Sequence, residues 1–176
     1  MGLAFRTAVI AFSMSVTAAA AQAQEQSLEY QVQAAYLYNF VKFVEWPTGA
    51  LGGAITICTA GTTPVAPALE QIVRDEVISG HRLAVRTIDA PQAACNVVFV
   101  PREVVASEYL RSARTAPVLT VGESPDFIAQ GGIINFVRDA GMMRFEIDQE
   151  AARRARLQIS SRLLRLARTP AKPVQR

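Results

Sequence analysis

Apolar residues recur at steps of three and four along residues 28–45, which is the spacing of one face of an α-helix. This pattern predicts a long helix whose last residue is Glu45, because Trp46, the residue before Pro47, disfavours helical backbone angles. The opposite face of the predicted helix is also apolar, so the helix needs covering on more than one side. The residues that carry this second face are Ala34, Leu37, Tyr38 and Val41.

The same helical spacing returns over residues 148–168 and predicts a long last helix. Asp148 is a favourable N-cap, since its carboxylate can accept hydrogen bonds from free backbone N–H groups. We expect Ser160 and Ser161 to lie within this helix and to allow close packing. The predicted buried stripe is Ala152, Ala155, Ile159, Leu163 and Leu166, and the other side carries Arg154, Gln158, Arg162, Arg165 and Arg168.

Between these helices, short β-branched and apolar runs alternate with weaker helical patterns. The predicted strands are 54–59, 82–88, 95–100 and 117–121, and the predicted helices are 65–76, 102–114 and 124–130. Two further runs, 133–137 and 142–147, flank a turn that contains Asp and Gly, which predicts a hairpin. In its second strand, Met143, Phe145 and Ile147 would face the core.

Strands that alternate with helices favour a mostly parallel sheet. The sequence therefore predicts an α/β fold. Its centre would be a mostly parallel sheet of five to six strands flanked by helices, with a C-terminal hairpin and a long last helix.

Residues 1–23 have the three parts of a secretory signal peptide: a positive residue, an apolar run and the cleavage site Ala21-Gln22-Ala23. The apolar run is shorter than the ~20 residues that a membrane span needs. We therefore expect the segment to be cleaved on export and the mature protein not to span a membrane. This leaves a single domain over 24–169 and a flexible tail over 170–176.

Composition excludes several classes of protein. With 51% hydrophobic and 19% charged residues among 176, the chain can build a core, so most of it is not disordered. A net charge of +3 is too small to argue for nucleic acid. Two cysteines and one histidine leave little for a metal site, and we expect His81 to be a solvated loop residue. No nucleophile stands in a recognisable relation to a base, so we expect no enzymatic activity and no cofactor.

Cys58 and Cys95 are the two cysteines of the chain. After export to an oxidising compartment they are most simply joined in one disulfide, which would add roughly 4 kcal/mol in the chain-entropy model. The alternative is two buried thiols that pack as small apolar groups. Gly131-Gly132 precedes a strand rather than a helix, so it indicates a turn with unusual backbone angles, not a phosphate site.

Three blocks together resemble the YfiR-like family of small periplasmic proteins. They are QVQAAYLYNFVKFVEWP (31–47), the pair ITICTAG (55–61) and CNVVFVP (95–101), and VLTVGESPDFIAQGGIINFV (118–137) with MRFEIDQEAARRARLQISSRLLRLAR (143–168). The combination is specific, although no single block is, and it covers most of residues 31–168.

The resemblance implies a periplasmic, non-enzymatic regulator that acts by binding. The best-known family member binds the periplasmic part of an inner-membrane diguanylate cyclase and holds it inactive, which lowers cyclic-di-GMP and limits biofilm. Other members accompany sensor kinases or outer-membrane proteins. Family members form homodimers and have a disulfide at strand positions that look like those of Cys58 and Cys95. The best-known member has a second cysteine pair that this chain lacks.

Two surfaces are candidates for contact with a partner. The first is a partner or dimer interface, for which ordinary burial inside the fold is the alternative; its residues are Leu37, Tyr38, Val41 and Trp46. The second is a basic face that would meet an acidic partner or anionic lipid head groups, with a solvated surface as the alternative; its residues are Arg154, Arg162, Arg165 and Arg168.

A second function class stays open from the sequence: a periplasmic sensor that binds a small ligand and reports it to a histidine kinase or transporter. Such a sensor needs a concave pocket with a few convergent polar groups. A periplasmic hydrolase is a third class, but the nucleophile and base that it requires are not recognisable.

Overall fold

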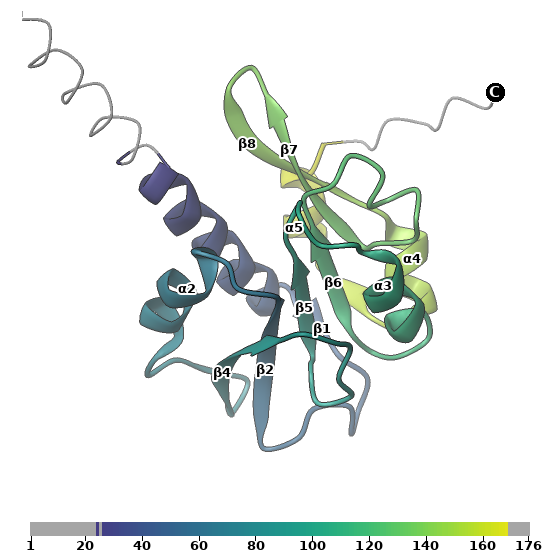
Figure 1. Cartoon of the computed structure of the whole chain (residues 1–176). Coiled ribbons are helices and arrows are strands. Elements are labelled where there is room, and N and C mark those ends of the chain that lie inside the picture. Colours follow the sequence, from purple (N-terminus) through teal and green to yellow (C-terminus); the bar gives the residue numbers. More distant parts are fainter. Residues whose placement is uncertain (1–23, 25, 169–176) are drawn as a thin grey trace, which may run out of the picture.

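The computed structural model describes residue 24 and residues 26–168, which Figure 1 colours along the sequence. The predicted signal peptide over 1–23 and the predicted tail over 170–176 lie outside the described residues. Within the described part, helices lie on both sides of one central sheet.

Seven strands form this sheet in the order β3-β4-β2-β5-β6-β7-β8. The five inner strands are parallel, while the edge strands β3 and β8 are antiparallel to their neighbours. The predicted α/β class is therefore confirmed. The strand number exceeds the expected five to six because the very short β3 pairs back onto β4. The bounds are β2 Ala54–Ala60, β3 Val77–Ile78, β4 His81–Ile88, β5 Val97–Val100, β6 Leu119–Gly122, β7 Ile134–Asp139 and β8 Met142–Ile147.

The two faces of the sheet carry separate cores. Helix α2 (Val65–Val73) and the N-terminal helix (residues 26–42) lie on one side, and α3 (Ser107–Ala113) lies on the other (Figure 1). Both α2 and α3 are shorter than the predicted helices 65–76 and 102–114. We call the two sides the helix face and the α3 face. The helix-face core includes Leu37, Phe40, Ile57, Phe99 and Phe136, and the α3-face core includes Cys58, Val98, Tyr109, Leu110 and Phe127.

The N-terminal helix ends at residue 42, three residues before the predicted end. The next residues form β1 (Val44–Glu45), which pairs antiparallel with β9 (Gln158–Ile159). The N–H group of Ser160 extends this pairing by donating to the carbonyl of Phe43 at 2.9 Å. Pairing with a distant segment, rather than Pro47, therefore sets the end of the helix.

The predicted long last helix is wrong as one continuous element. It consists of two short helices, α4 (Gln149–Arg154) and α5 (Ser161–Leu166), with β9 between them. The chain turns at Arg156, whose φ is +60°. Ser160 is not inside a helix but is the N-cap of α5, and its hydroxyl accepts from the N–H of Leu163 at 3.4 Å.

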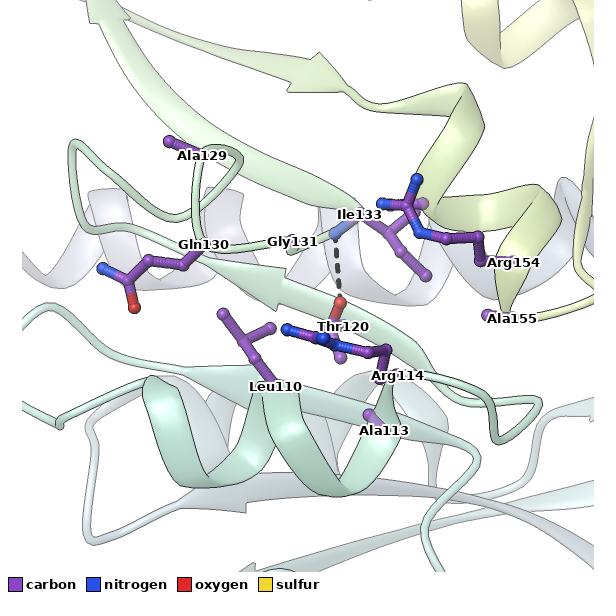
Figure 2. Close-up of a pocket in the computed structure, with 11 residues that line it drawn as sticks. Leu110, Ala113, Arg114, Thr120, Ala129, Gln130, Gly131, Ile133, Arg154 and Ala155 are labelled. Carbon is purple, nitrogen blue, oxygen red and sulfur yellow. Dashed lines mark hydrogen bonds between the residues drawn. The ribbon is translucent and has the colours of Figure 1, made fainter. Parts of the chain in front are cut away.

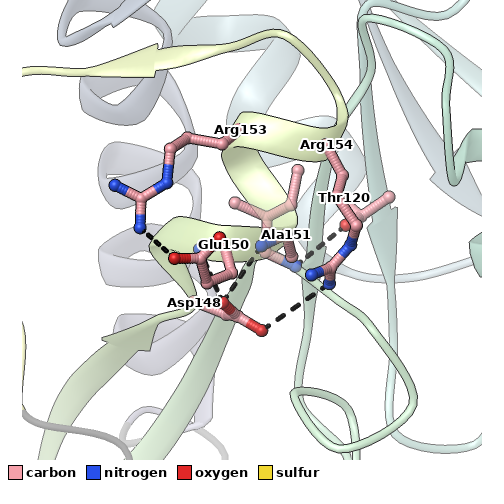
Figure 3. A network of polar contacts seen from close by, with 7 residues as sticks. Thr120, Asp148, Glu150, Ala151, Arg153 and Arg154 are labelled. Atoms are coloured by element: carbon pink, nitrogen blue, oxygen red, sulfur yellow. Dashed lines mark hydrogen bonds and ion pairs between the residues drawn. The ribbon is translucent and has the colours of Figure 1, made fainter.

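The start of the segment is as predicted. The Asp148 carboxylate caps α4 by accepting from the N–H groups of Glu150 and Ala151, at 2.8 and 3.0 Å (Figure 3). Of the predicted buried stripe, Ala152, Ala155 and Leu163 are buried and Ile159 is partly buried. Leu166 is 64% exposed, because the break rotates α5 away from the register of α4.

The predicted hairpin is confirmed. Strands β7 and β8 are joined by Ala140 and Gly141, whose φ angles are +48° and +78°. Two positive φ angles are typical of the tight turns that match the twist of paired strands. Phe145 and Ile147 are buried and Met143 is partly buried, while Met142 is 54% exposed, as the alternation predicts.

The segment 124–130 forms turns and not the predicted short helix. Its centre is Phe127, which is fully buried between two glycines. A Cβ at Gly122 or at Gly132 would lie 2.2 Å from the Phe127 ring. Gly131 has a φ of +99°, which agrees with the unusual backbone predicted for this glycine pair. The two neighbours thus have different roles, since Gly131 makes the turn and Gly132 makes room for the ring.

Candidate interaction surface and pocket

The N-terminal helix is buried at one end and exposed at the other. Leu37, Phe40 and Val41 are at most 1% exposed, within the helix-face core. This corrects the prediction that Leu37 and Val41 line an interface, because the chain's own core covers both of them. Double-sided burial, the alternative stated from the sequence, accounts for these two residues.

One apolar stripe continues along the helix beyond the core. Leu28, Val32, Tyr36 and Phe40 lie four residues apart, so they share a face of the helix. Phe40 is fully buried and Tyr36 is partly buried, whereas Val32 is 37% and Leu28 is 60% exposed. We call Leu28 and Val32 the exposed stripe. Two large apolar side chains one turn apart and in water are the strongest sign of an interaction surface on this helix.

Polar contacts hold the N-terminal helix in a fixed orientation relative to the rest of the domain. Glu29 forms an ion pair with Arg138 of β7, so the exposed end of the helix is tied to the hairpin. Deeper in the helix, the side-chain amide of Gln33 donates to the carboxylate of Glu123, and Gln33 is only 3% exposed.

Glu123 is a partly buried carboxylate directly after β6. Its second oxygen accepts from the backbone N–H of Arg102 at 3.2 Å. Burial raises the pKa of Glu123 above its usual range, although the hydrogen bonds from Arg102 and Gln33 act in the opposite direction. Glu123 thus links the N-terminal helix to a loop of the α3 face.

The other two predicted interface residues are partly exposed. The hydroxyl of Tyr38 donates to the carboxylate of Glu76, which raises the Tyr38 pKa, and the Lys42 ammonium lies 5.0 Å from the centre of the ring. Trp46 packs against the helix-face core, and its buried Nε1 has no partner among the described residues. Contact of Tyr38 and Trp46 with a partner stays a prediction.

The predicted basic face is not one surface, because the helix that was to carry it is broken. Arg154 lies on α4, 4.0 Å from Asp148. Arg162 of α5 lies over the ring of Phe43 at 5.9 Å, and Arg168 pairs with Asp139 at 3.7 Å. Arg165 is exposed. Three of the four arginines thus make separate local contacts, and the four do not form one row.

Cys58 and Cys95 form a disulfide, with their Cα atoms 5.7 Å apart. Cys58 lies on β2, and Cys95 lies just before the neighbouring strand β5. Both belong to the α3-face core. The bridge therefore fastens the centre of the sheet on the side that the short helix α3 covers.

His81 begins β4 and does not lie in a loop. Its Nδ1 lies 2.8 Å from the carbonyl oxygen of Gly52 and its side chain is partly buried, which indicates a structural role. Among the residues that the structure describes, no group of three or more potential metal ligands is present. No helix in this part is long and apolar enough to cross a membrane.

A pocket of about 340 Å³ opens between α3 and α4 (Figure 2). Arg114, the C-cap of α3, and Arg154 of α4 both line it, together with Thr120 of β6. The neighbouring Arg153 does not line the pocket and pairs with Glu150 instead (Figure 3). Sequence analysis missed Arg114, because no motif surrounds it and only the fold brings it opposite Arg154.

The family of the chain follows from a comparison with protein-family models. Residues 30–168 match the YfiR/HmsC-like family, and the chain belongs to this family. The resemblance drawn from the three sequence blocks is thus confirmed. The family is periplasmic and regulatory rather than catalytic. A search of curated proteins gives no match.

Proposed function

We propose that this member of the YfiR/HmsC-like family is a periplasmic, non-enzymatic regulator that binds and inhibits an inner-membrane signalling enzyme. The proposed enzyme is a diguanylate cyclase, so the output is a lower level of cyclic-di-GMP. Family membership over residues 30–168 carries the proposal. The predicted export signal and the exposed stripe of the N-terminal helix support it.

The exposed stripe is the proposed contact with the periplasmic domain of the cyclase. Leu28 and Val32 would bury on binding, which is worth about 3 kcal/mol for two such side chains, or about a hundredfold in affinity. Glu29 beside the stripe is held by Arg138, so it does not leave an unpaired charge next to the apolar contact. The helix presents the stripe in a fixed direction, which reduces the ordering cost of binding.

Inhibition then follows from differential binding. If the regulator binds the inactive arrangement of the cyclase domain more tightly than the active one, its presence shifts the cyclase toward the inactive state. A hundredfold preference is enough to reverse an equilibrium that otherwise favours the active state tenfold. The regulator itself needs no chemical step.

The test is a cross-linking capture of the tagged protein, matured from Gln24, in its own periplasm. Wild type should recover one inner-membrane protein with a cyclase domain, and deletion of the gene should raise cyclic-di-GMP. The double variant Leu28→Asp, Val32→Asp should lose the capture and should fail to lower cyclic-di-GMP, because two charges cannot enter an apolar contact.

The control is Val105→Asp, which changes a residue that is 74% exposed and lies before α3, far from the stripe in sequence. It should behave as wild type. If the Leu28, Val32 variant captures and represses as wild type does, the stripe is not the contact surface. If wild type recovers only a second copy of itself and deletion leaves cyclic-di-GMP unchanged, the proposed function is wrong. Loss of that self-capture in the Leu28, Val32 variant would then make the stripe a dimer contact.

A further inference from the structure

We propose that the pocket between α3 and α4 binds a small organic anion, whose carboxylate or phosphate is held between Arg114 and Arg154. This goes beyond inhibition of a membrane enzyme, since it assigns a ligand site between α3 and α4, separate from the exposed stripe. It also identifies a candidate binding site for the small-ligand sensor function that the sequence leaves open.

The two arginines converge on one cavity. Figure 2 shows the side chain of Arg114 reaching in from the end of α3 and that of Arg154 from α4, with Thr120 between them. Arg114 has no carboxylate within ion-pair distance among the described residues. Arg154 has only Asp148, at 4.0 Å, and that carboxylate already caps α4. Two like charges facing one cavity repel each other, and a bound oxyanion would turn this repulsion into attraction.

A third donor lies at the bottom of the cavity. Thr120 is only 2% exposed, and its hydroxyl oxygen accepts from the N–H of Ile133 at 3.0 Å. The hydroxyl proton has no acceptor among the described residues, so it is free to donate to a ligand. A buried hydroxyl donor between two guanidinium groups is suited to one oxyanion group.

The rest of the lining determines what else the ligand carries. Most of the remaining lining is apolar, and it also includes the backbone at Gly131 and the polar Gln130; the apolar members are Leu110, Ala113, Ala129, Ile133, Ala151 and Ala155. A volume of about 340 Å³ is at the small end of ligand pockets. The site therefore fits a compact molecule with one anionic group and an apolar or aromatic body, and a bare inorganic ion would leave the apolar walls unfilled.

Occupancy of the site would also tie α3 to α4. The chain continues from α4 into β9, which pairs with β1 at the end of the N-terminal helix. Any change in α4 on binding thus has a covalent and hydrogen-bonded route to the helix that carries the exposed stripe.

The experiment measures binding to the purified protein, matured from Gln24, by titration calorimetry and NMR. The probes are benzoate, phenyl phosphate, inorganic phosphate and the neutral analogue benzyl alcohol. We expect saturable binding of benzoate or phenyl phosphate with a dissociation constant in the millimolar range or below. Benzyl alcohol and inorganic phosphate should each bind at least tenfold more weakly.

Variants locate the site. Arg114→Gln and Arg154→Gln should each weaken binding at least tenfold, whereas the matched control Arg153→Gln, on the same helix but outside the pocket, should bind as wild type. All three residues are exposed, so the variants should fold, and far-UV circular dichroism checks this.

Failure to bind either organic anion, or equal binding by the Arg114 and Arg154 variants, would overturn the proposal. Inorganic phosphate that binds as tightly as phenyl phosphate would overturn the organic part of it. None of these readouts depends on a partner enzyme, so the pocket and the proposed function can fail separately.

Discussion

The two faces of the central sheet are stabilised by different means. On the helix face, Tyr36, Phe40, Phe136 and Phe145 form a cluster of rings, and the centres of Tyr36 and Phe40 lie 5.0 to 5.9 Å from each other and from those of the two other rings. On the α3 face, the cover is a helix of seven residues and a loop. There the disulfide and the enclosed ring of Phe127 take the place of extensive burial.

This difference predicts which face of the sheet should open first. A face covered by a long helix with interlocking rings loses much apolar contact when it opens, so its opening costs a large free energy. A face covered by a short helix loses less apolar contact when it opens. A disulfide on that face stabilises the fold, because it removes conformations that the unfolded chain would otherwise adopt. The α3 face should therefore depend on its bridge, while the helix face should not.

The largest expected effect comes from removing the bridge. The double variant Cys58→Ser, Cys95→Ser opens a loop with a sequence separation of 37 residues, which is worth about 4 kcal/mol of unfolding free energy. Denaturant unfolding measures the loss. In native-state hydrogen exchange of the variant, the amides of β5 and α3 should open at a lower free energy than those of the N-terminal helix, whose opening free energy is limited only by global unfolding.

The variant Cys58→Ala, Cys95→Ala is the control, because it removes the bridge without placing hydroxyl groups in the core. It should lose most of the same free energy. Equal opening free energies for the N-terminal helix and for α3 in the variant would contradict the unequal roles of the two faces.

The next effect concerns the ring of Phe127. In Gly122→Ala the new Cβ would lie 2.2 Å from that ring, so the ring or the strand must shift, at a cost of about 3 kcal/mol. Gly53→Ala is the matched control, since nothing lies within 4 Å of a Cβ there and its φ is not positive. Thermal unfolding of both variants measures the difference, and equal melting temperatures would show that the loop around Phe127 yields without cost.

The sequence predicts the sheet better than the helices for a physical reason. Strands such as β2 and β5 are continuous runs of apolar and β-branched residues that only a buried strand accommodates. The segment 148–168 has helical spacing throughout, but two short helices satisfy that spacing as well as one long helix does. What separates them is the pairing of β9 with β1, a contact between residues more than a hundred positions apart, which no local pattern carries.

The same limit applies to the candidate sites. The cysteine pair could be predicted because the chain contains no other cysteine and the compartment restricts their chemistry. Leu37 and Leu28 lie in the same apolar helix, and only the packed structure shows that the first is buried and the second exposed. The convergence of Arg114 and Arg154 depends on the relative position of α3 and α4, so it is a property of the fold and not of either segment.

The smallest effect is a pH dependence at Glu123, the residue that joins the two faces through Gln33 and Arg102. Burial raises its pKa in the folded protein above the ordinary value of 4.5, so the folded state favours the protonated form. This contribution to stability is fully present below pH 4.5 and is lost as the pH rises through the raised pKa.

Glu123→Gln keeps a neutral side chain at every pH. The unfolding free energy of the variant relative to wild type should therefore increase as the pH rises from 4.5 toward neutrality, whatever constant offset the substitution adds. Denaturant unfolding at a series of pH values measures this slope. A difference between Glu123→Gln and wild type that stays constant with pH would mean that the hydrogen bonds from Gln33 and Arg102 fully offset burial, so that the link between the two faces does not depend on pH.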